Sequence, residues 1–452
     1  MTPTDPSTLP LGRLRPPRRL SRTTLLLWAG AAAVAAAVLL PTVYLLLRAL
    51  AADAAVLATL LRPGTWATLA RTAWLAVAVT AAATLLAVPL AWLTARTDLP
   101  LRRVWATLLP LPLVIPSYVG AYLYASALGP RGLLQQALEG PLNIARLPTI
   151  YGFPGALFTL TMLSYPYMLL SVRAALWRMD PAAEEAARSL GYGPWGTFWR
   201  VTLPLLRPAI GAGGLLVALY ALRDFGAVAL MRYDTFTRVI YVQYRSFDRA
   251  GAALYALLLI GLTLLILALE ARTRGRARYD QGGVGVTRPP ATVALGTWRW
   301  PALALCAAVV GLGLVLPAGM LLFWLVRGLR AGEGLGPLWA PTLNALLASG
   351  LAAGATVLAA LPVAILIVRR PGRLTRLLEG LCYSAFALPG IAVALALVFF
   401  GIGLAPFLYQ SLAMLVLAYG VLFLPQAVGA LRGALLQVHP SLEEAARSLG
   451  LG

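Results

Sequence analysis

The sequence contains no lysine, a single histidine and only two cysteines. A nucleotide-binding phosphate loop requires a lysine, so the chain carries no ATPase of that kind. His439 alone cannot form a histidine-rich metal site, and Cys306 and Cys382 both lie in apolar runs, which excludes a disulfide framework or cysteine metal cluster. Charged residues make up 12% of the chain, against roughly 25% in soluble proteins. This deficit indicates a polytopic membrane protein.

Hydrophobic residues make up 60% of the chain and gather in runs long enough for membrane helices, which need ~20 residues. Uncharged runs of this kind occupy Leu25–Leu47, Thr72–Ala95, Val104–Leu128, Leu147–Val172, Ala250–Leu269, Trp300–Val326 and Pro337–Val368. Gly380–Leu431 is long enough for two spans, with a break near Gly401–Pro406. Pro208–Met231 forms one more span, with Arg223 and Asp224 as its charged residues. We therefore predict an all-α bundle of about ten membrane helices.

The net charge of +21 comes from 37 basic residues, all of them arginine. With the N-terminus inside, most of them fall on the same side of the membrane, as the positive-inside bias requires. These inside residues include Arg13, Arg15, Arg18, Arg19, Arg22, Arg96, Arg102, Arg103, the Arg272–Arg278 cluster, Arg369, Arg370, Arg373 and Arg376. Arg232, Arg238, Arg245 and Arg249 would lie outside. This distribution favours a multi-pass inner-membrane protein with a cytoplasmic N-terminus, in contact with lipid, over a nucleic-acid-binding protein.

An eight-residue segment, Glu-Glu-Ala-Ala-Arg-Ser-Leu-Gly, occurs at 184–191 and again at 443–450. Pro166 and Pro425 precede the two copies at the same offset of 259, and Pro89 matches Pro362 at an offset of 273. The second half is therefore a shorter copy of the first, with the deletion expected in the external loop 129–148. Each copy follows the fourth span of its half, so both face the same side. This is a parallel repeat, whereas many secondary transporters have inverted ones.

The repeat divides the chain into four parts. Residues 1–24 form a basic cytoplasmic N-terminus, 25–270 a first half of six helices, 271–299 a flexible basic cytoplasmic linker, and 300–452 the second half. The second copy stops at Gly452, before its own end and before the two helices that should follow. We therefore expect the last two helices of the second half to be missing.

The first copy is expected to form a short cytoplasmic helix within a loop at about 180–204. Asp180 is a plausible N-cap, and Pro181 suits the first helical turn. Glu184 and Glu185 lie near the positive end of the helix, and Gly191 permits a left-handed turn that ends it. A second segment, Pro194–Arg200, follows. Such a charged helix–turn–helix between two membrane spans suits a surface for a cytoplasmic partner.

Glu185-Ala186-Ala187, followed by Gly191, Val201 and Leu203-Pro204, resembles the EAA signature of ABC importer permeases, with valine in place of the usual isoleucine. The resemblance implies a type I importer permease, with this loop as the coupling helix in a groove of a separate ATPase subunit. Two ATPase copies would hold the ATP and Mg, and this chain would need no cofactor. The coupling residues would be Glu184, Glu185, Ala186, Ala187, Gly191, Leu203 and Pro204, with Glu443, Glu444, Ala445, Ala446 and Gly450 in the second copy.

Arg223-Asp224-Phe225-Gly226, with the following stretch 232–237, resembles the fifth-span region of ferric iron importer permeases, whose halves are also fused. Ionisable residues inside a membrane mark functional sites by default, although a structural pair holding helices together is an equal alternative. The candidate pathway residues are Tyr220, Arg223, Asp224, Tyr233 and Asp234. Oxygens of Asp224, Tyr220 and Tyr233 would suit a hard cation such as Fe³⁺. The resemblance also implies an extracytoplasmic solute-binding protein that selects the substrate and meets the loop 232–249.

Three alternatives remain open at this level. The substrate could be thiamine, another small cation or an anion. The chain could be an ion-coupled secondary transporter, although same-side repeats with cytoplasmic carboxylates disfavour that class. The early stop could also make it an inactive truncated fragment.

Overall fold

The computed structural model describes residues 22–274 and 292–438, together with Ser441 and Ser448. This part of the chain is helical, and its one strand-like pairing is an isolated bridge between Thr97 and Val293. Eight helical segments within it are long and apolar enough to cross a membrane: Thr24–Leu50, Pro63–Arg96, Phe153–Arg178, Pro194–Arg223, Arg249–Leu269, Gly296–Arg330, Gly336–Arg369 and Leu412–Gln437. The predicted all-α membrane bundle is confirmed.

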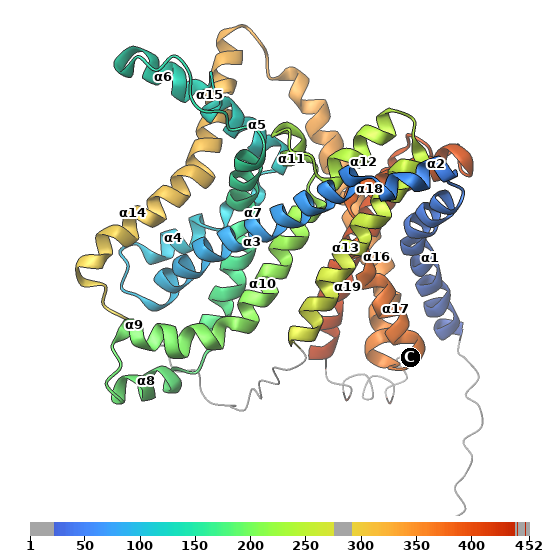
Figure 1. Cartoon of the computed structure of the whole chain (residues 1–452). Coiled ribbons are helices and arrows are strands. Elements are labelled where there is room, and N and C mark those ends of the chain that lie inside the picture. Colours follow the sequence, from blue (N-terminus) through green and yellow to red (C-terminus); the bar gives the residue numbers. More distant parts are fainter. Residues whose placement is uncertain (1–21, 275–291, 439–440, 442–447, 449–452) are drawn as a thin grey trace, which may run out of the picture.

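The helices of the first half follow the order expected from hydropathy, with short helices added at both ends of the spans (Figure 1). They are α1 (Arg22–Leu50), α2 (Ala54–Leu57), α3 (Pro63–Arg96), α4 (Arg102–Leu108), α5 (Ser117–Leu128), α6 (Leu133–Leu142), α7 (Phe153–Arg178), α8 (Pro181–Ser189), α9 (Pro194–Thr197), α10 (Leu203–Arg223), α11 (Gly226–Leu230), α12 (Phe236–Arg245) and α13 (Arg249–Arg274). The last of these continues beyond residue 270 into the predicted linker.

The second half repeats the first in its helix lengths. Its described helices are α14 (Arg299–Val310), α15 (Leu316–Arg330), α16 (Gly336–Arg369), α17 (Arg373–Ser384), α18 (Gly390–Gly403) and α19 (Leu412–Gln437). Both α3 and α16 have 34 residues, and both α7 and α19 have 26. In contrast, α6 has no counterpart between α18 and α19, where the sequence predicts the deletion. These lengths agree with the predicted duplication, and the predicted break near Gly401–Pro406 is confirmed, because α18 ends at Gly403.

The third predicted span, Val104–Leu128, is not one straight helix. The chain bends by 102° between the segments Arg102–Val114 and Ser117–Leu142. Pro110, Pro112 and Pro116 remove backbone donors there, and Ile115 before Pro116 is extended, with a φ of −83° and a ψ of 117°, which explains the break. The second half breaks at the equivalent position, between α17 and α18 at Pro389.

The span predicted as Pro208–Met231 also differs. Its helix α10 begins earlier, at Leu203, and ends at Arg223. Residues Phe198–Thr202 form a π-helical turn that joins α9 directly to α10, so the predicted separate segment Pro194–Arg200 is the first part of the membrane helix Pro194–Arg223.

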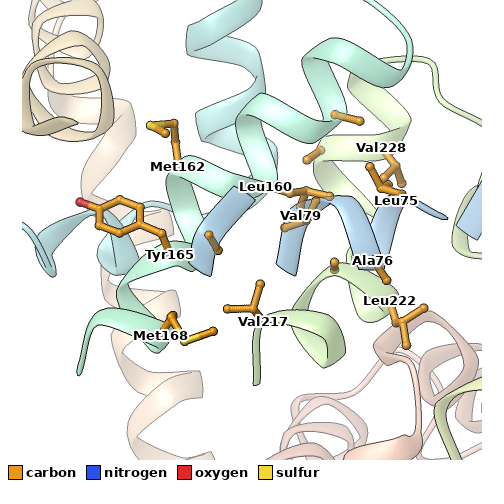
Figure 2. Packing of buried hydrophobic residues seen from close by; sticks show 14 of the residues in the cluster. Leu75, Ala76, Val79, Leu160, Met162, Tyr165, Met168, Val217, Leu222 and Val228 are labelled. Atoms are coloured by element: carbon orange, nitrogen blue, oxygen red, sulfur yellow. The ribbon is translucent and has the colours of Figure 1, made fainter. Parts of the chain in front are cut away.

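The centre of the first half is the contact among α3, α7 and α10 (Figure 2). Leu75 and Val79 of α3 meet Leu160 of α7 and Val217 of α10 in one buried cluster. Small residues bring the helices close, because a Cβ added at Gly213 would lie 2.8 Å from the Met168 sulfur. This core holds the ends of α3, α7 and α10 in fixed positions.

The two halves exchange their first helices. Helix α1 packs against α16, α17 and α18 of the second half, where Ala31, Val34 and Val38 are buried with Val363 and Leu424. Helix α15 packs against α5 of the first half. In the described residues the two halves therefore pack against each other through these exchanged helices.

Candidate coupling site and transport region

Helix α8 carries the complete copy of the repeated segment, and its ends are capped as its sequence predicts. The Asp180 carboxylate accepts a hydrogen bond from the Ala182 amide at 3.0 Å. Gly191 has a φ of +86°, which glycine adopts without strain. The Gly191 and Tyr192 amides donate to the carbonyls of Arg188 and Ala187, which satisfies carbonyl groups at the helix end. Both predicted caps are confirmed.

The two adjacent carboxylates of α8 point in different directions. Glu184 and Ala187 are buried, with exposed fractions of 5% each. Glu185 and Ala186 are exposed. Because Glu184 faces the protein, only the face with Glu185 and Ala186 is available to a partner.

Glu184 joins α8 to three membrane helices. Its Oε1 accepts a hydrogen bond from the Thr202 hydroxyl at 2.8 Å, just before α10. Its Oε2 lies 3.6 Å from Nη1 of Arg96, the last residue of α3, and 3.9 Å from Nη2 of Arg188. Nη2 of Arg96 donates to the Leu176 carbonyl of α7 at 2.8 Å. A displacement of α8 therefore acts directly on the ends of α3, α7 and α10.

Tryptophan side chains extend this junction towards the second half. Trp195 of α9 lies 5.9 Å from Trp92 of α3 and 6.3 Å from Trp298, measured between ring centroids. Val293 forms backbone hydrogen bonds with Arg96 and Asp98. The end of the predicted linker is thus held against the coupling loop, and it borders an apolar groove of about 470 Å³ that Leu203 also lines.

Pro204 is the second residue of α10 and directly follows the π-helical turn Phe198–Thr202, where its ring removes one backbone donor from the continuous helix. The second copy of the motif, with Glu443, Glu444, Ala445, Ala446 and Gly450, lies outside the described residues, as does His439.

The structure places three of the predicted pathway residues at the end of α10. Tyr220 lies on α10, its ring 5.7 Å from that of Tyr167. Arg223 is half-buried and forms no ion pair within the described chain. Asp224 is 8% exposed and accepts a hydrogen bond from the Ala227 amide at 2.8 Å, so its carboxylate begins α11. Asp224 therefore caps α11 in this conformation, which is a structural role.

The other two pathway candidates lie in the loop between α11 and α12, where the Tyr233 amide donates to the Val228 carbonyl of α11 at 2.9 Å. Asp234 forms an ion pair with Arg238 on α12. The Tyr233 hydroxyl lies 3.5 Å from the Arg71 carbonyl, and partial burial raises the pKa of that phenol. The ligand set of Asp224, Tyr220 and Tyr233 stays a prediction, and the described residues include no cluster of three or more His, Cys, Asp or Glu that could hold a metal ion.

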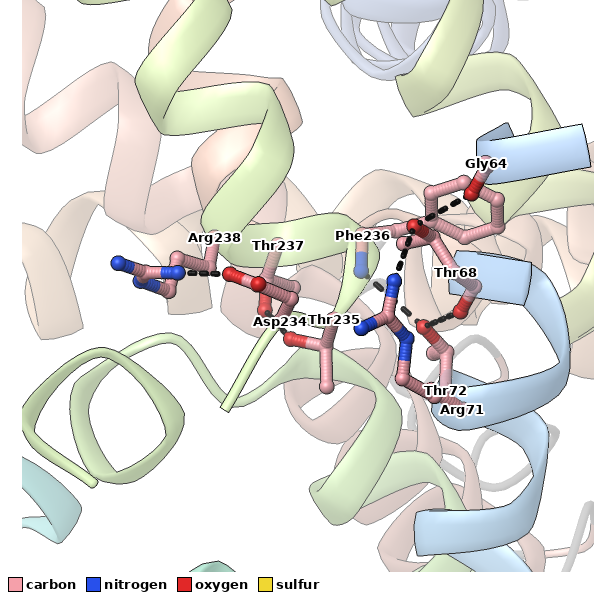
Figure 3. Close-up of polar contacts among 9 residues, drawn as sticks. All are labelled: Gly64, Thr68, Arg71, Thr72, Asp234, Thr235, Phe236, Thr237 and Arg238. Carbon is pink, nitrogen blue, oxygen red and sulfur yellow. Dashed lines mark hydrogen bonds and ion pairs between the residues drawn. The ribbon is translucent and has the colours of Figure 1, made fainter. Parts of the chain in front are cut away.

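A polar network fixes this end of the molecule (Figure 3). The Phe236 amide donates to the Thr72 hydroxyl at 3.1 Å, which ties the start of α12 to α3. The Thr237 hydroxyl donates to the Asp224 carbonyl at 2.7 Å. Helix α12 is thereby joined to the break between α10 and α11.

Comparison with known proteins identifies this architecture. The sequence profile of the family described as "Binding-protein-dependent transport system inner membrane component" matches residues 87–278. The chain is 34% identical over 417 residues to the Fe(3+)-transport system permease protein FbpB 2 of Haemophilus influenzae, covering 91% of this chain and 78% of that relative. The chain belongs to this family of ABC importer permeases.

Two shorter similarities agree with this membership. The permease is 36% identical over 137 residues to the molybdenum transport system permease protein ModB of Escherichia coli, covering 30% of this chain and 58% of ModB. It is 26% identical over 184 residues to the probable sulfate transport system permease protein cysT of Chlorokybus atmophyticus, covering 39% of this chain and 63% of that relative. The family thus includes permeases named for chemically different substrates.

Sequence reasoning missed Arg96 and Thr202 as partners of Glu184. One sequence feature would have found the arginine: the offset of 273 that relates α3 to α16 also matches Arg96 with Arg369. In the structure, Nη2 of Arg369 donates to the Val438 carbonyl near the end of α19. An arginine thus ends the same helix in both halves of the permease.

Proposed function

We propose that the permease is the membrane subunit of an importer in which separate ATPase subunits bind at α8 and its second copy. The observation that supports this most is the division of α8 into an outer face with Glu185 and Ala186 and an inner face fixed by Glu184. Closure of two ATPase subunits would displace the outer face, and Glu184 would pass that displacement to the membrane helices. ATP and Mg would reside on the partner, and this chain would catalyse no reaction itself.

The proposed orientation places the N-terminus and α8 in the cytoplasm. Arg96, Arg102 and Arg370 lie at helix ends on the α8 side, and Arg370 donates to Thr24 at the start of α1. An excess of arginine on that side supports the assignment. An extracytoplasmic solute-binding protein would then deliver substrate to the opposite face. Binding of the partner proteins would shift the equilibrium between inward-open and outward-open states of the permease, and this shift would carry the substrate across.

We propose ferric iron as the substrate. The relative named for Fe(3+) transport matches 91% of this chain, whereas the molybdenum relative matches 30%. Because the Asp224 carboxylate caps α11, we assign selection for iron to the binding protein. Tyr220 and Arg223 would line the route.

Uptake by proteoliposomes tests this substrate. Vesicles containing the permease with its ATPase and binding protein should accumulate labelled Fe³⁺ only when ATP is enclosed, and unlabelled Fe³⁺ should compete. Thiamine, molybdate and sulfate should not compete. ATP-dependent uptake of one of these solutes without iron uptake would contradict the iron assignment and leave the permease role intact.

A further inference from the structure

A cavity of about 550 Å³ lies between the first half and α15. Figure 1 shows that α6 and α15 lie at the end of the molecule opposite α8. The charged residues that line the cavity are Arg131 after α5, Arg146 before α7 and Arg327 of α15. Neutral polar groups of Ser126 and Gln136 complete the wall. The cavity therefore joins three cationic side chains from three separate segments.

These cations have no anionic partner within the described residues. Arg131, Arg146 and Arg327 form no ion pair there, and no carboxylate lines the cavity. The nearby Glu139 accepts a hydrogen bond from the Gln135 amide, and Glu333 lines a neighbouring cavity that Arg327 also lines, without forming an ion pair with it. Guanidinium groups in this arrangement repel one another, and a carboxylate would offset that repulsion and offer paired acceptors.

Internal contacts hold the cavity walls in place. The buried Gln135 side chain donates to the Ile144 and Ala145 carbonyls, which fixes the loop carrying Arg146 on α6. The Leu147 amide donates to the Pro130 carbonyl at 3.1 Å, which joins that loop to the turn carrying Arg131. These bonds place two arginines side by side without an ion pair.

Helix α15 forms the remaining wall of the cavity, and its side chains there also make specific contacts. Arg327 lies over the Trp324 ring at 5.3 Å, a favourable contact between a cation and an aromatic face. The indole nitrogen of Trp324 is buried and has no acceptor in the described part of the chain. The three arginines are exposed, so their guanidinium groups are accessible to a partner that approaches this face.

Within the described residues the segment that forms this cavity occurs once, whereas the helical core is duplicated. The segment with α6, which supplies Arg131 and Arg146, has no counterpart between α18 and α19. The motif proposed to bind ATPase subunits occurs twice. A feature present once suits a single asymmetric partner, and a binding protein that delivers one substrate is such a partner.

We propose that this cavity receives an acidic side chain of the extracytoplasmic binding protein. This inference rests on the proposed function, which places the face opposite α8 outside the cytoplasm. The arginines would attract the acidic surface of the binding protein over long range and then fix its orientation by pairing with one carboxylate.

The test uses the complete transporter in proteoliposomes and measures ATP hydrolysis against binding-protein concentration. Replacing Arg131, Arg146 and Arg327 together by glutamine should raise the half-saturating concentration about tenfold, with the maximal rate unchanged. The wild-type value should rise steeply with salt, and the variant's should rise less. Arg62→Gln, an exposed arginine of the same face outside the cavity, should behave as wild type.

The outcomes separate this proposal from the proposed function. Absence of stimulation in the wild-type complex would contradict the function itself. Stimulation with the same half-saturating concentration in the triple variant would contradict the cavity alone. An effect that follows the anionic lipid content of the vesicles, or stimulation by inorganic phosphate alone, would assign the cavity to a headgroup or a free anion and overturn the proposal. Retention of the ATPase subunit during purification verifies that the variant is folded.

Discussion

At the residue scale, the position of α8 depends on Arg96. This side chain is 2% exposed, and it contacts both the Glu184 carboxylate and the Leu176 carbonyl. Removing one member of a buried ion pair leaves the other charge without compensation, which costs more than the intact pair contributes. Arg96 is therefore expected to determine how α8 is attached to the bundle.

Arg96→Gln should destabilise the coupling loop by about 3 kcal/mol, because Glu184 stays buried without its partner. Glu184→Gln should also weaken the loop, because it leaves the buried Arg96 guanidinium without a carboxylate, although Thr202 can still donate to the amide oxygen. The double variant should cost less than the sum of the two. Thermal unfolding and ATP-driven uptake measure this coupling, with Arg178→Gln, an exposed arginine at the end of α7, as the control. Additive effects would show that the two side chains act independently.

The local features of this site could be predicted from sequence, whereas its contacts could not. Asp180 and Gly191 act on their own helix ends, so their residue types alone indicate their tasks. The burial of Glu184 depends on Arg96 and Thr202, which are distant in sequence. From its position in the first helical turn alone, Glu184 was grouped with Glu185 as a residue that would meet the ATPase subunit. Likewise, the hydrogen bond from the Ala227 amide to Asp224 was not predictable, because hydropathy continued one span through Asp224 to Met231.

At the element scale, the core depends on the close approach of α10 to α7. Gly213 lies where an added Cβ would be 2.8 Å from the Met168 sulfur and 3.0 Å from its Cα. Gly211 lies on the same helix with nothing within 4 Å of such a Cβ. The two glycines differ mainly in the space around them.

Gly213→Leu should force α10 away from α7 and lower stability by about 1–3 kcal/mol, the usual cost of overpacking. Gly211→Leu adds the same side chain at an open position and should be close to neutral. Thermal unfolding of the purified complex compares the two. Equal destabilisation by both variants would show that the backbone, and not helix contact, sets the requirement for glycine.

Hydropathy located the membrane elements but not their bends. The run Val104–Leu128 is apolar throughout, so its composition is the same whether it forms one span or a bent pair. Pro110, Pro112 and Pro116 were the available indication of a break. The split between α18 and α19 was predictable, because glycine and proline flank it. The start of α10 was misplaced because the π-helical turn keeps the loop and the membrane helix continuous.

At the scale of the whole molecule, the permease combines a duplicated core with features that occur once. The exchange of α1 and α15 joins the two halves, so a displacement at one coupling loop is transmitted to both halves. Duplication was predictable from spacing, since the offsets of 259 and 273 carry over to α7/α19 and α3/α16. The exchange was not predictable, because apolar helix faces do not reveal which half they meet.

The most direct test of a separate ATPase acting through the outer face of α8 is ATP-dependent uptake by the reconstituted complex with Glu185→Lys. Reversing this exposed charge should reduce uptake at least about tenfold and prevent co-purification of the ATPase, while membrane insertion is retained. Asp53→Lys, the same reversal on the opposite face, should leave both intact. Gly191→Leu should also lose uptake, because leucine at a φ of +86° is strained. Uptake and ATPase co-purification that both survive Glu185→Lys would contradict the coupling role.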